Sequence, residues 1–205
     1  DLSASMDELC RVPSRSPPGA TVAYHPISSW VLLAELLQRR TGHDLRTLSR
    51  ELLLDPLGLD QVGYGVSSDR LDDVALHAYT GARNVPVMRD IFIRTVGVTP
   101  RKAVELSNSP AFLQGILPSA NVVSTPRQIT RFMQMLLEGG SLRGVRVLSE
   151  DTVERMLGWE TPRSFDGTFG FPVRYGLGLM KGGRRFSLFG RDMRHAFGHL
   201  GFSNI

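Results

Sequence analysis

The residues in this sequence best suited to chemistry are a tyrosine and a histidine that lie far apart along the chain. Tyr24 ends a loop that contains Pro-Pro-Gly at 17–19, and His199 lies in a glycine-flanked stretch near the last residue. A tyrosine phenol has an unperturbed pKa of about 10, and nearby positive charge can lower it enough for the phenolate to act as a base. A histidine can hold a reacting group by a hydrogen bond. On residue type alone both are candidates for such roles, beside the simpler interpretations of a turn tyrosine and a strand histidine.

A serine nucleophile with an adjacent base is not recognisable in the sequence. Three residues before the two lysines, Lys102 and Lys181, stand Thr99 and Gly178, so no Ser-x-x-Lys motif occurs. That motif places a nucleophile and a lysine one helical turn apart. Gly-x-Ser-x-Gly is also absent. The sequence therefore does not support the α/β-hydrolase fold, whose nucleophile lies in that motif.

The remaining histidines do not predict a metal centre. His195 and His199 are four residues apart and would lie on one face of a strand. No third ligand stands near them in the sequence, so we expect no metal and no other cofactor. His25 precedes Pro26 and either hydrogen-bonds within its loop or contributes to a site beside Tyr24.

Two helices are predicted directly after Tyr24. Leucines at helical spacing indicate a helix at about Ser28–Thr41, with a serine cap at its start and Gly42 at its end. A second helix is expected at about Asp44–Leu54, with the aspartate as its cap.

The middle of the chain is less regular. Residues 60–118 contain many glycines and prolines and form either a lid or binding loop or a set of short helices and turns. Ser124-Thr125-Pro126 then predicts the start of a helix that ends at Gly139-Gly140. A short capped helix is expected at about Ser149–Leu157.

The last quarter of the sequence changes to the period of strands. The expected strands are Tyr175–Lys181, Arg185–Phe189 and His195–Leu200. The first two are expected to pair through a turn at Gly182-Gly183. Helices followed by strands are typical of an α+β domain with an antiparallel sheet. We therefore expect one partial domain, with residues 1–160 mostly helical and including the Tyr24 loop, and residues 170–205 forming strands.

Composition indicates an ordinary globular protein with no preference for nucleic acid or membrane. The net charge of +4 comes from 24 basic and 20 acidic residues, and the arginines are scattered, many beside acids. A nucleic-acid binder groups its basic residues on one face. No apolar run approaches the roughly 18 residues of a membrane helix, and Cys10 is the single cysteine, so no internal disulfide is expected. The compartment stays open, with the cytoplasm slightly favoured.

Four stretches resemble the serine β-lactamase and penicillin-binding-protein family in order and spacing. They are Pro18-Gly19-x-x-x-x-Tyr24, the run from Leu36 to Pro56-Leu57-Gly58, Leu117-Pro118-Ser119-Ala120-Asn121 followed by Ser124-Thr125-Pro126, and Phe197-Gly198-His199-Leu200-Gly201. Within the branch of class C β-lactamases and family VIII carboxylesterases, Tyr24-His25 in place of Tyr-Ser-Asn is more similar to the esterases. The resemblance covers nearly the whole chain and implies the β-lactamase/transpeptidase-like fold, a helical region with an antiparallel sheet.

The resemblance also implies a serine hydrolase that acts on a small-molecule ester or amide through an acyl-enzyme. Tyr24 would be its general base, and His199 would hold the leaving group or a substrate carboxylate. The backbone N–H of Phe202, just past Gly201, would be one oxyanion donor, and His25 would lie near the substrate. A carboxylesterase is the expected activity. A β-lactamase, D-aminopeptidase or acyltransferase of the same fold stays open, as does a catalytically silent binding or scaffold member.

One feature of the family is missing from the expected place. The family's Ser-x-x-Lys lies several tens of residues before the tyrosine, whereas 23 residues precede Tyr24 here. The chain also stops at Ile205, just after the strand motif. We therefore expect an internal part of a longer protein, with the nucleophile and the remainder of the fold supplied by flanking sequence or another chain.

Overall fold

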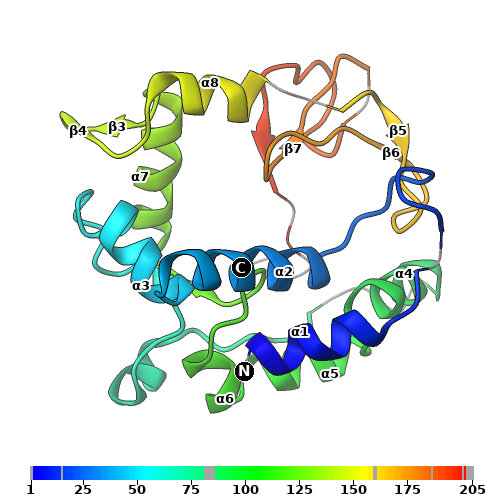
Figure 1. Cartoon of the computed structure of the whole chain (residues 1–205), viewed down its shortest axis with the longest axis horizontal. Helices are drawn as coiled ribbons and strands as arrows, with labels where there is room; N and C mark the ends of the chain where they lie inside the picture. The colour runs from blue at the N-terminus through cyan, green and yellow to red at the C-terminus, as the bar shows by residue number, and fades with distance from the viewer. Residues whose placement is uncertain are drawn as a thin grey trace. The chain divides into compact units, whose positions relative to one another are not determined.

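The computed structural model describes residues 2–14, 16–80, 86–158, 161–185, 187–199 and 201. The chain divides into two compact units, coloured along the sequence in Figure 1. The first unit contains Asp1–Arg15 and His25–Met133, and the second contains Ser16–Tyr24 and Gln134–Ile205. The loop that ends at Tyr24 therefore belongs to the same unit as the C-terminal strands.

The first unit consists of helices and one short pair of strands. Its helices are α1 (Leu2–Arg11), α2 (Ser28–Thr41), α3 (Leu45–Ser49), α4 (Pro86–Val96), α5 (Pro100–Ser107) and α6 (Pro110–Gln114), with a π-helical turn at Arg50–Leu54 and a 3-10 turn at Ser68–Asp73. Its strands, β1 (Gly63–Tyr64) and β2 (Val122–Val123), pair antiparallel. In the described part of 60–118, the chain forms short helices and turns with one short strand, which is close to the second of its two interpretations.

Local sequence signals set the ends of α2 and α3. The Gly42 N–H donates to the Gln38 carbonyl at a φ of 75°, a left-handed conformation that glycine adopts without strain. The Asp44 side chain caps α3 by accepting the Thr47 N–H at 2.8 Å. The predicted serine cap of α2 is wrong, because Ile27 occupies that position without a side-chain hydrogen bond. The second predicted helix is present but widens to a π-helical turn after α3.

The buried centre of the first unit is formed by residues on both sides of the Pro-Leu-Gly segment at 56–58. Leu54, Leu59 and Val62 are buried together, and Phe132 packs against them from α7 (Pro126–Leu137). Asn121, only 3% exposed, accepts the Leu117 N–H and donates to two backbone carbonyls. The Pro-Ser-Ala-Asn stretch is therefore held by its own buried amide.

Helix α2 buries an unexpected face. Val31, Ala34 and Glu35 are buried. The leucines whose spacing predicted the helix are instead 44–60% exposed: Leu32, Leu33, Leu36 and Leu37. Helical spacing correctly predicted the helix but did not predict which side packs within this chain.

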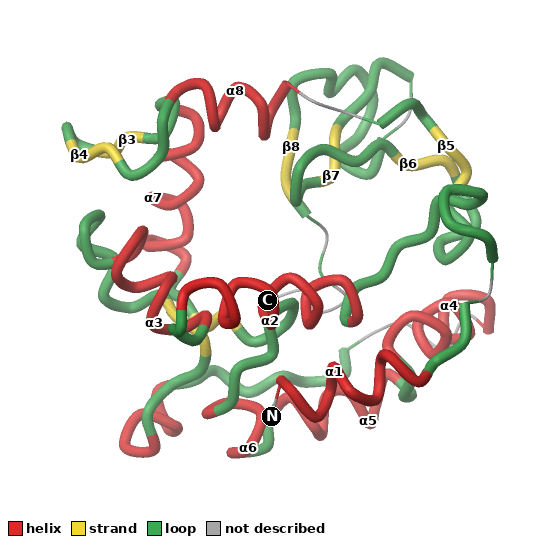
Figure 2. Tube along the Cα trace, viewed as in Figure 1, coloured by secondary structure: helices red, strands yellow, loops and turns green. Residues whose placement is uncertain are grey.

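The second unit holds the remaining helix and the C-terminal strands. Its helix α8 spans Glu150–Gly158, and its strands are β3 (Ser141–Leu142), β4 (Val145–Arg146), β5 (Ser164–Phe165), β6 (Pro172–Val173), β7 (Met180–Lys181) and β8 (Phe197–Gly198). They pair antiparallel as β3 with β4, β5 with β6 and β7 with β8. Figure 2 shows them as short yellow segments joined by longer loops. Within the described ranges no helix is long and apolar enough to cross a membrane.

The predicted hairpin through Gly182-Gly183 is wrong. Strand β7 pairs with β8, whereas the described residues of 185–189 contain no strand. The pairing continues beyond β7, because the Gly182 N–H donates to the Ala196 carbonyl at 2.8 Å and the Met193 N–H donates to the Gly183 carbonyl at 3.0 Å. A Cβ at Gly182 would lie 1.7 Å from the Met193 oxygen. This glycine therefore permits close approach of two paired backbones and does not form a turn.

Candidate functional site

The structure brings Tyr24 and His199 into direct contact within the second unit. The Tyr24 Oη lies 2.9 Å from the His199 Nε2, within hydrogen-bond distance. The two rings are tilted by 37°, with centroids 5.5 Å apart. These residues are 175 positions apart in the sequence, so the contact is a product of the fold. A phenol oxygen and an imidazole nitrogen at this distance can share a hydrogen bond.

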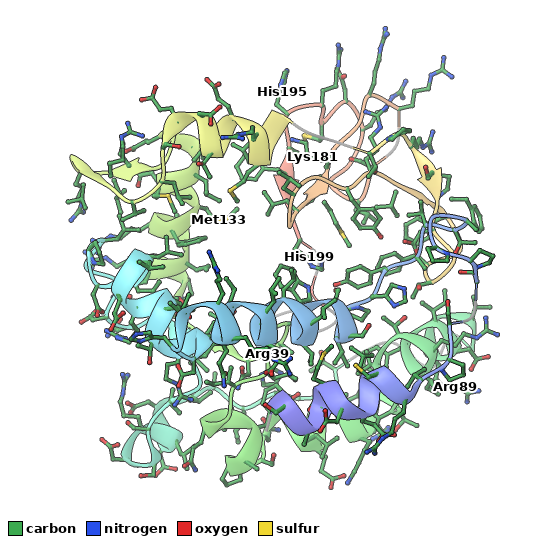
Figure 3. All side chains as sticks on the ribbon, viewed as in Figure 1. Arg39, Arg89, Met133, Lys181, His195 and His199 are labelled. Atoms are coloured by element: carbon green, nitrogen blue, oxygen red, sulfur yellow. The ribbon has the colours of Figure 1, made fainter. Side chains whose placement is uncertain are left out.

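His199 is placed by the strand before it. Strand β8 ends at Gly198, which pairs with Met180, and Phe197 pairs with Lys181. Figure 3 labels His195 and His199, which lie at opposite ends of β8. Among the described residues, no group of three or more His, Cys, Asp or Glu side chains could hold a metal ion.

Tyr24 is held by a turn at residues 166–169. The Gly167 N–H donates to the Val22 carbonyl at 2.8 Å, and the Thr168 hydroxyl donates to the Tyr24 carbonyl at 3.0 Å. The Phe169 ring stacks on the Tyr24 ring, with centroids 5.0 Å apart and planes 17° apart. Both the main chain and the side chain of Tyr24 are thus fixed by consecutive residues of one turn.

The turn is built around Asp166, which is 0% exposed. Its Oδ1 accepts the N–H groups of Thr168 and Phe169 at 2.8 and 2.9 Å. Its Oδ2 accepts the Tyr175 hydroxyl at 2.8 Å. A buried carboxylate is stable only when its oxygens are hydrogen-bonded, and these donors meet that need. The Tyr175 ring also lies nearly parallel to the Tyr24 ring, at 4° and 6.3 Å between centroids.

The residues around Tyr24 favour its neutral phenol. Burial raises the pKa of Tyr24, and the negative charge of Asp166 raises it further. Burial also raises the pKa of Tyr175, with its hydrogen bond to Asp166 as the next cause. A Tyr24 base was expected to need nearby positive charge, and these neighbours act in the opposite direction.

The raised pKa values of three tyrosines predict how they titrate. Tyr24, Tyr64 and Tyr175 should ionise at higher pH in the folded chain than in the unfolded chain, chiefly because each is partly buried. Their contribution to stability should be complete below the unfolded pKa of about 10 and be lost as the pH rises through the raised folded values. Tyrosinate absorbance measured against pH, in buffer and in denaturant, tests this. Superimposable titration curves would contradict it.

The other candidate positions are less constrained. His25 lies in the first unit, is exposed, and its carbonyl accepts the Ser29 hydroxyl at 2.5 Å. Gly201 is exposed, and Phe202 lies outside the described residues. Sequence reasoning missed Asp166, whose Asp-Gly-Thr-Phe-Gly context gives only the signal of a turn.

The chain is similar to known proteins along nearly all of its length. A family model described as Beta-lactamase matches residues 2–205. Among curated proteins, the esterase/beta-lactamase LipL of Mycobacterium tuberculosis is 28% identical over 142 residues, which cover 64% of this chain and 33% of LipL.

Solved structures give the same result. A penicillin-binding protein homologue from Caulobacter crescentus superposes with a TM-score of 0.75 at 25% identity, covering 97% of this chain and 52% of that protein. A family VIII carboxylesterase superposes with a TM-score of 0.80 at 22% identity, covering 98% of this chain and 52% of the esterase. The chain thus spans about half the length of these structures and about a third of LipL. The expected α+β fold of the β-lactamase/transpeptidase kind is confirmed.

Proposed function

Because the chain belongs to the beta-lactamase family, we propose that the protein containing it is a serine hydrolase that cleaves small carboxylic esters through an acyl-enzyme. The observation that carries the proposal is the 2.9 Å contact between Tyr24 and His199. In the proposal, the rest of the fold, with a Ser-x-x-Lys nucleophile, comes from sequence outside this chain or from another chain.

The proposed reaction assigns each residue one task. The Tyr24 phenolate accepts the proton of the serine hydroxyl, whose oxygen attacks the ester carbonyl. Backbone N–H groups, that of Phe202 among them, stabilise the oxyanion. The tetrahedral intermediate collapses, the Tyr24 phenol returns the proton to the departing alkoxide, and an alcohol leaves. A water molecule then repeats the sequence on the acyl-enzyme and releases the acid.

The neighbours of Tyr24 define what the missing parts must supply. Burial and Asp166 raise the pKa of Tyr24, so the phenolate needs a cation beside it to form near neutral pH. The lysine of a Ser-x-x-Lys motif would provide that charge. His199, in contact with the Tyr24 Oη, would orient the phenol and hold the leaving group.

The preference for esters rests on two observations. Tyr24-His25 resembles the esterase branch of the family, and two of the similar proteins carry esterase or carboxylesterase in their descriptions. A D-amino acid amidase from Ochrobactrum anthropi also shares the fold, with a TM-score of 0.57 at 21% identity. β-Lactamase, D-aminopeptidase and acyltransferase activities are therefore the alternatives, together with a silent binding member.

The test compares substrate classes on the complete protein. We expect kcat/KM for a short-chain p-nitrophenyl ester to exceed that for a chromogenic cephalosporin and for a D-amino acid p-nitroanilide. A faster cephalosporin or anilide would replace the esterase with the corresponding alternative. Failure to hydrolyse all three, together with no covalent labelling by a fluorophosphonate, would identify a silent member.

A further inference from the structure

The carboxylate of Asp166 connects several of the contacts that hold Tyr24. It binds the N–H groups of Thr168 and Phe169, and these same residues contact Tyr24 through a hydroxyl and a ring. Gly167, which follows Asp166 directly, donates its N–H to the carbonyl of Val22, two residues before Tyr24. Without an acceptor at its centre, the turn would leave two partly buried N–H groups unpaired and would not keep this shape.

A second connection runs through Tyr175. Its hydroxyl donates to Asp166, and its ring lies parallel to the Tyr24 ring. Tyr24 therefore lies beside two aromatic rings, Phe169 and Tyr175, and the same buried carboxylate fixes both. The His199 Nε2 lies within hydrogen-bond distance of the Tyr24 phenol oxygen.

We propose that Asp166 is a positioning residue for Tyr24, which fixes the direction of the phenol by organising the 166–169 turn and the Tyr175 ring. The inference rests on the proposed function, in which Tyr24 is the base. Asp166 contacts the residues that hold Tyr24 and acts on the reaction through them.

The charge of Asp166 supplies a readout that packing alone would not move. Three ionisable groups that act on Tyr24 or lie beside its ring are Asp166, Tyr175 and His199. The Asp166 charge disfavours the phenolate, so its removal should lower the pKa of Tyr24. Burial is the larger cause of the raised Tyr24 pKa, so a variant must keep the packing and remove only the charge if the shift is to report on Asp166.

Two substitutions separate position from charge. Asp166→Asn is nearly isosteric and keeps an acceptor for the two backbone N–H groups, but it carries no charge. Asp166→Ala removes every acceptor. In the complete protein, Asp166→Ala should lower kcat by roughly 100-fold, the effect of a misplaced catalytic group, while KM changes little. Asp166→Asn should retain most of kcat and move the acid limb of the kcat/KM profile to lower pH.

The matched control is Asp192→Asn in the same unit. Asp192 pairs with Arg194 at 2.9 Å, and its side chain is 63% exposed. Its neutralisation should change neither kcat nor the pH profile. A folded Asp166→Ala protein with near-normal kcat would overturn the proposal. If that variant does not fold, an unmoved acid limb in Asp166→Asn overturns it.

A spectroscopic measurement distinguishes this failure from failure of the proposed function. The difference in tyrosinate absorbance between the parent protein and Tyr24→Phe isolates the titration of Tyr24. Asp166→Asn should move that difference to lower pH even in a protein with no hydrolase activity. Inactivity with this shift would reject the hydrolase and keep the effect of Asp166 on Tyr24, whereas activity without the shift would reject Asp166 alone.

Discussion

Replacing Tyr24 with phenylalanine is expected to lower kcat for ester hydrolysis in the complete protein by about 100-fold or more, the range of a lost general base. Phenylalanine keeps the ring that stacks on Phe169 and lies parallel to Tyr175. It removes only the hydroxyl that meets His199. Folding should therefore change little, and the loss should appear in kcat measured by steady-state kinetics on a chromogenic short-chain ester.

A second tyrosine provides the control for this substitution. Tyr64 is partly buried, has a raised pKa, and its hydroxyl donates to the Pro118 carbonyl at 3.2 Å. Tyr64→Phe thus removes a comparable phenol that has no role in the proposed chemistry, and should leave kcat near normal. Near-normal kcat in Tyr24→Phe would remove Tyr24 from the mechanism.

The helices whose ends depend on neighbouring residues were predictable from the sequence. Gly42 ends α2 at the expected residue, and Pro126 begins α7, with the Thr125 hydroxyl accepting the Gln128 N–H at 3.3 Å. Such signals act within one turn of helix, so they can be read without knowing the fold. Strand partners cannot be read in this way, and the error at Gly182-Gly183 shows the difference, because β7 pairs with residues 16 and 18 positions further along.

The candidate site also contains residues that short sequence motifs indicate and residues that only the fold brings together. Tyr24 and His199 were predicted because each lies in a short motif that resembles a family. The structure places the Tyr24 Oη 2.9 Å from the His199 Nε2, and their catalytic roles stay predictions. Asp166 and Tyr175 lie outside those motifs, and an Asp-Gly sequence alone predicts a turn. The proposed role of Asp166 depends on its zero exposure and on its closeness to Tyr24, which lies 142 positions earlier in the sequence. Both are properties of the folded chain.

The exposed leucines of α2 bear on how this chain would behave alone. Four leucines on this helix are 44–60% exposed, although an apolar stripe on a helix normally faces a core. Exposed apolar area of this kind marks a surface that packs against other protein. The observation agrees with the proposal that further sequence or another chain completes the fold, because the matching solved structures are about twice as long.

The other large expected effect is complete loss: the 205 residues by themselves should show no serine-hydrolase turnover. Acyl transfer requires a nucleophile, a base and oxyanion donors within reach of one carbonyl. This chain offers Tyr24 and His199, but it contains no Ser-x-x-Lys. Burial and the charge of Asp166 also raise the pKa of Tyr24. The motif that would supply both the nucleophile and the activating lysine is therefore absent from this sequence.

The measurement is labelling of the isolated chain with a fluorophosphonate, which reacts covalently with activated serines, beside an ester assay. The complete protein, which would carry the activated serine, is the positive control and should label stoichiometrically. The isolated chain should not label, because residues that act as a unit in catalysis are lost as a unit when one is missing. Circular dichroism of the isolated chain must show helix content, so that inactivity is not confused with unfolding. Mass spectrometry would locate any label. Stoichiometric modification of a serine within residues 1–205 would mean that this chain carries its own nucleophile, and the assignment of that role to flanking sequence or another chain would be wrong.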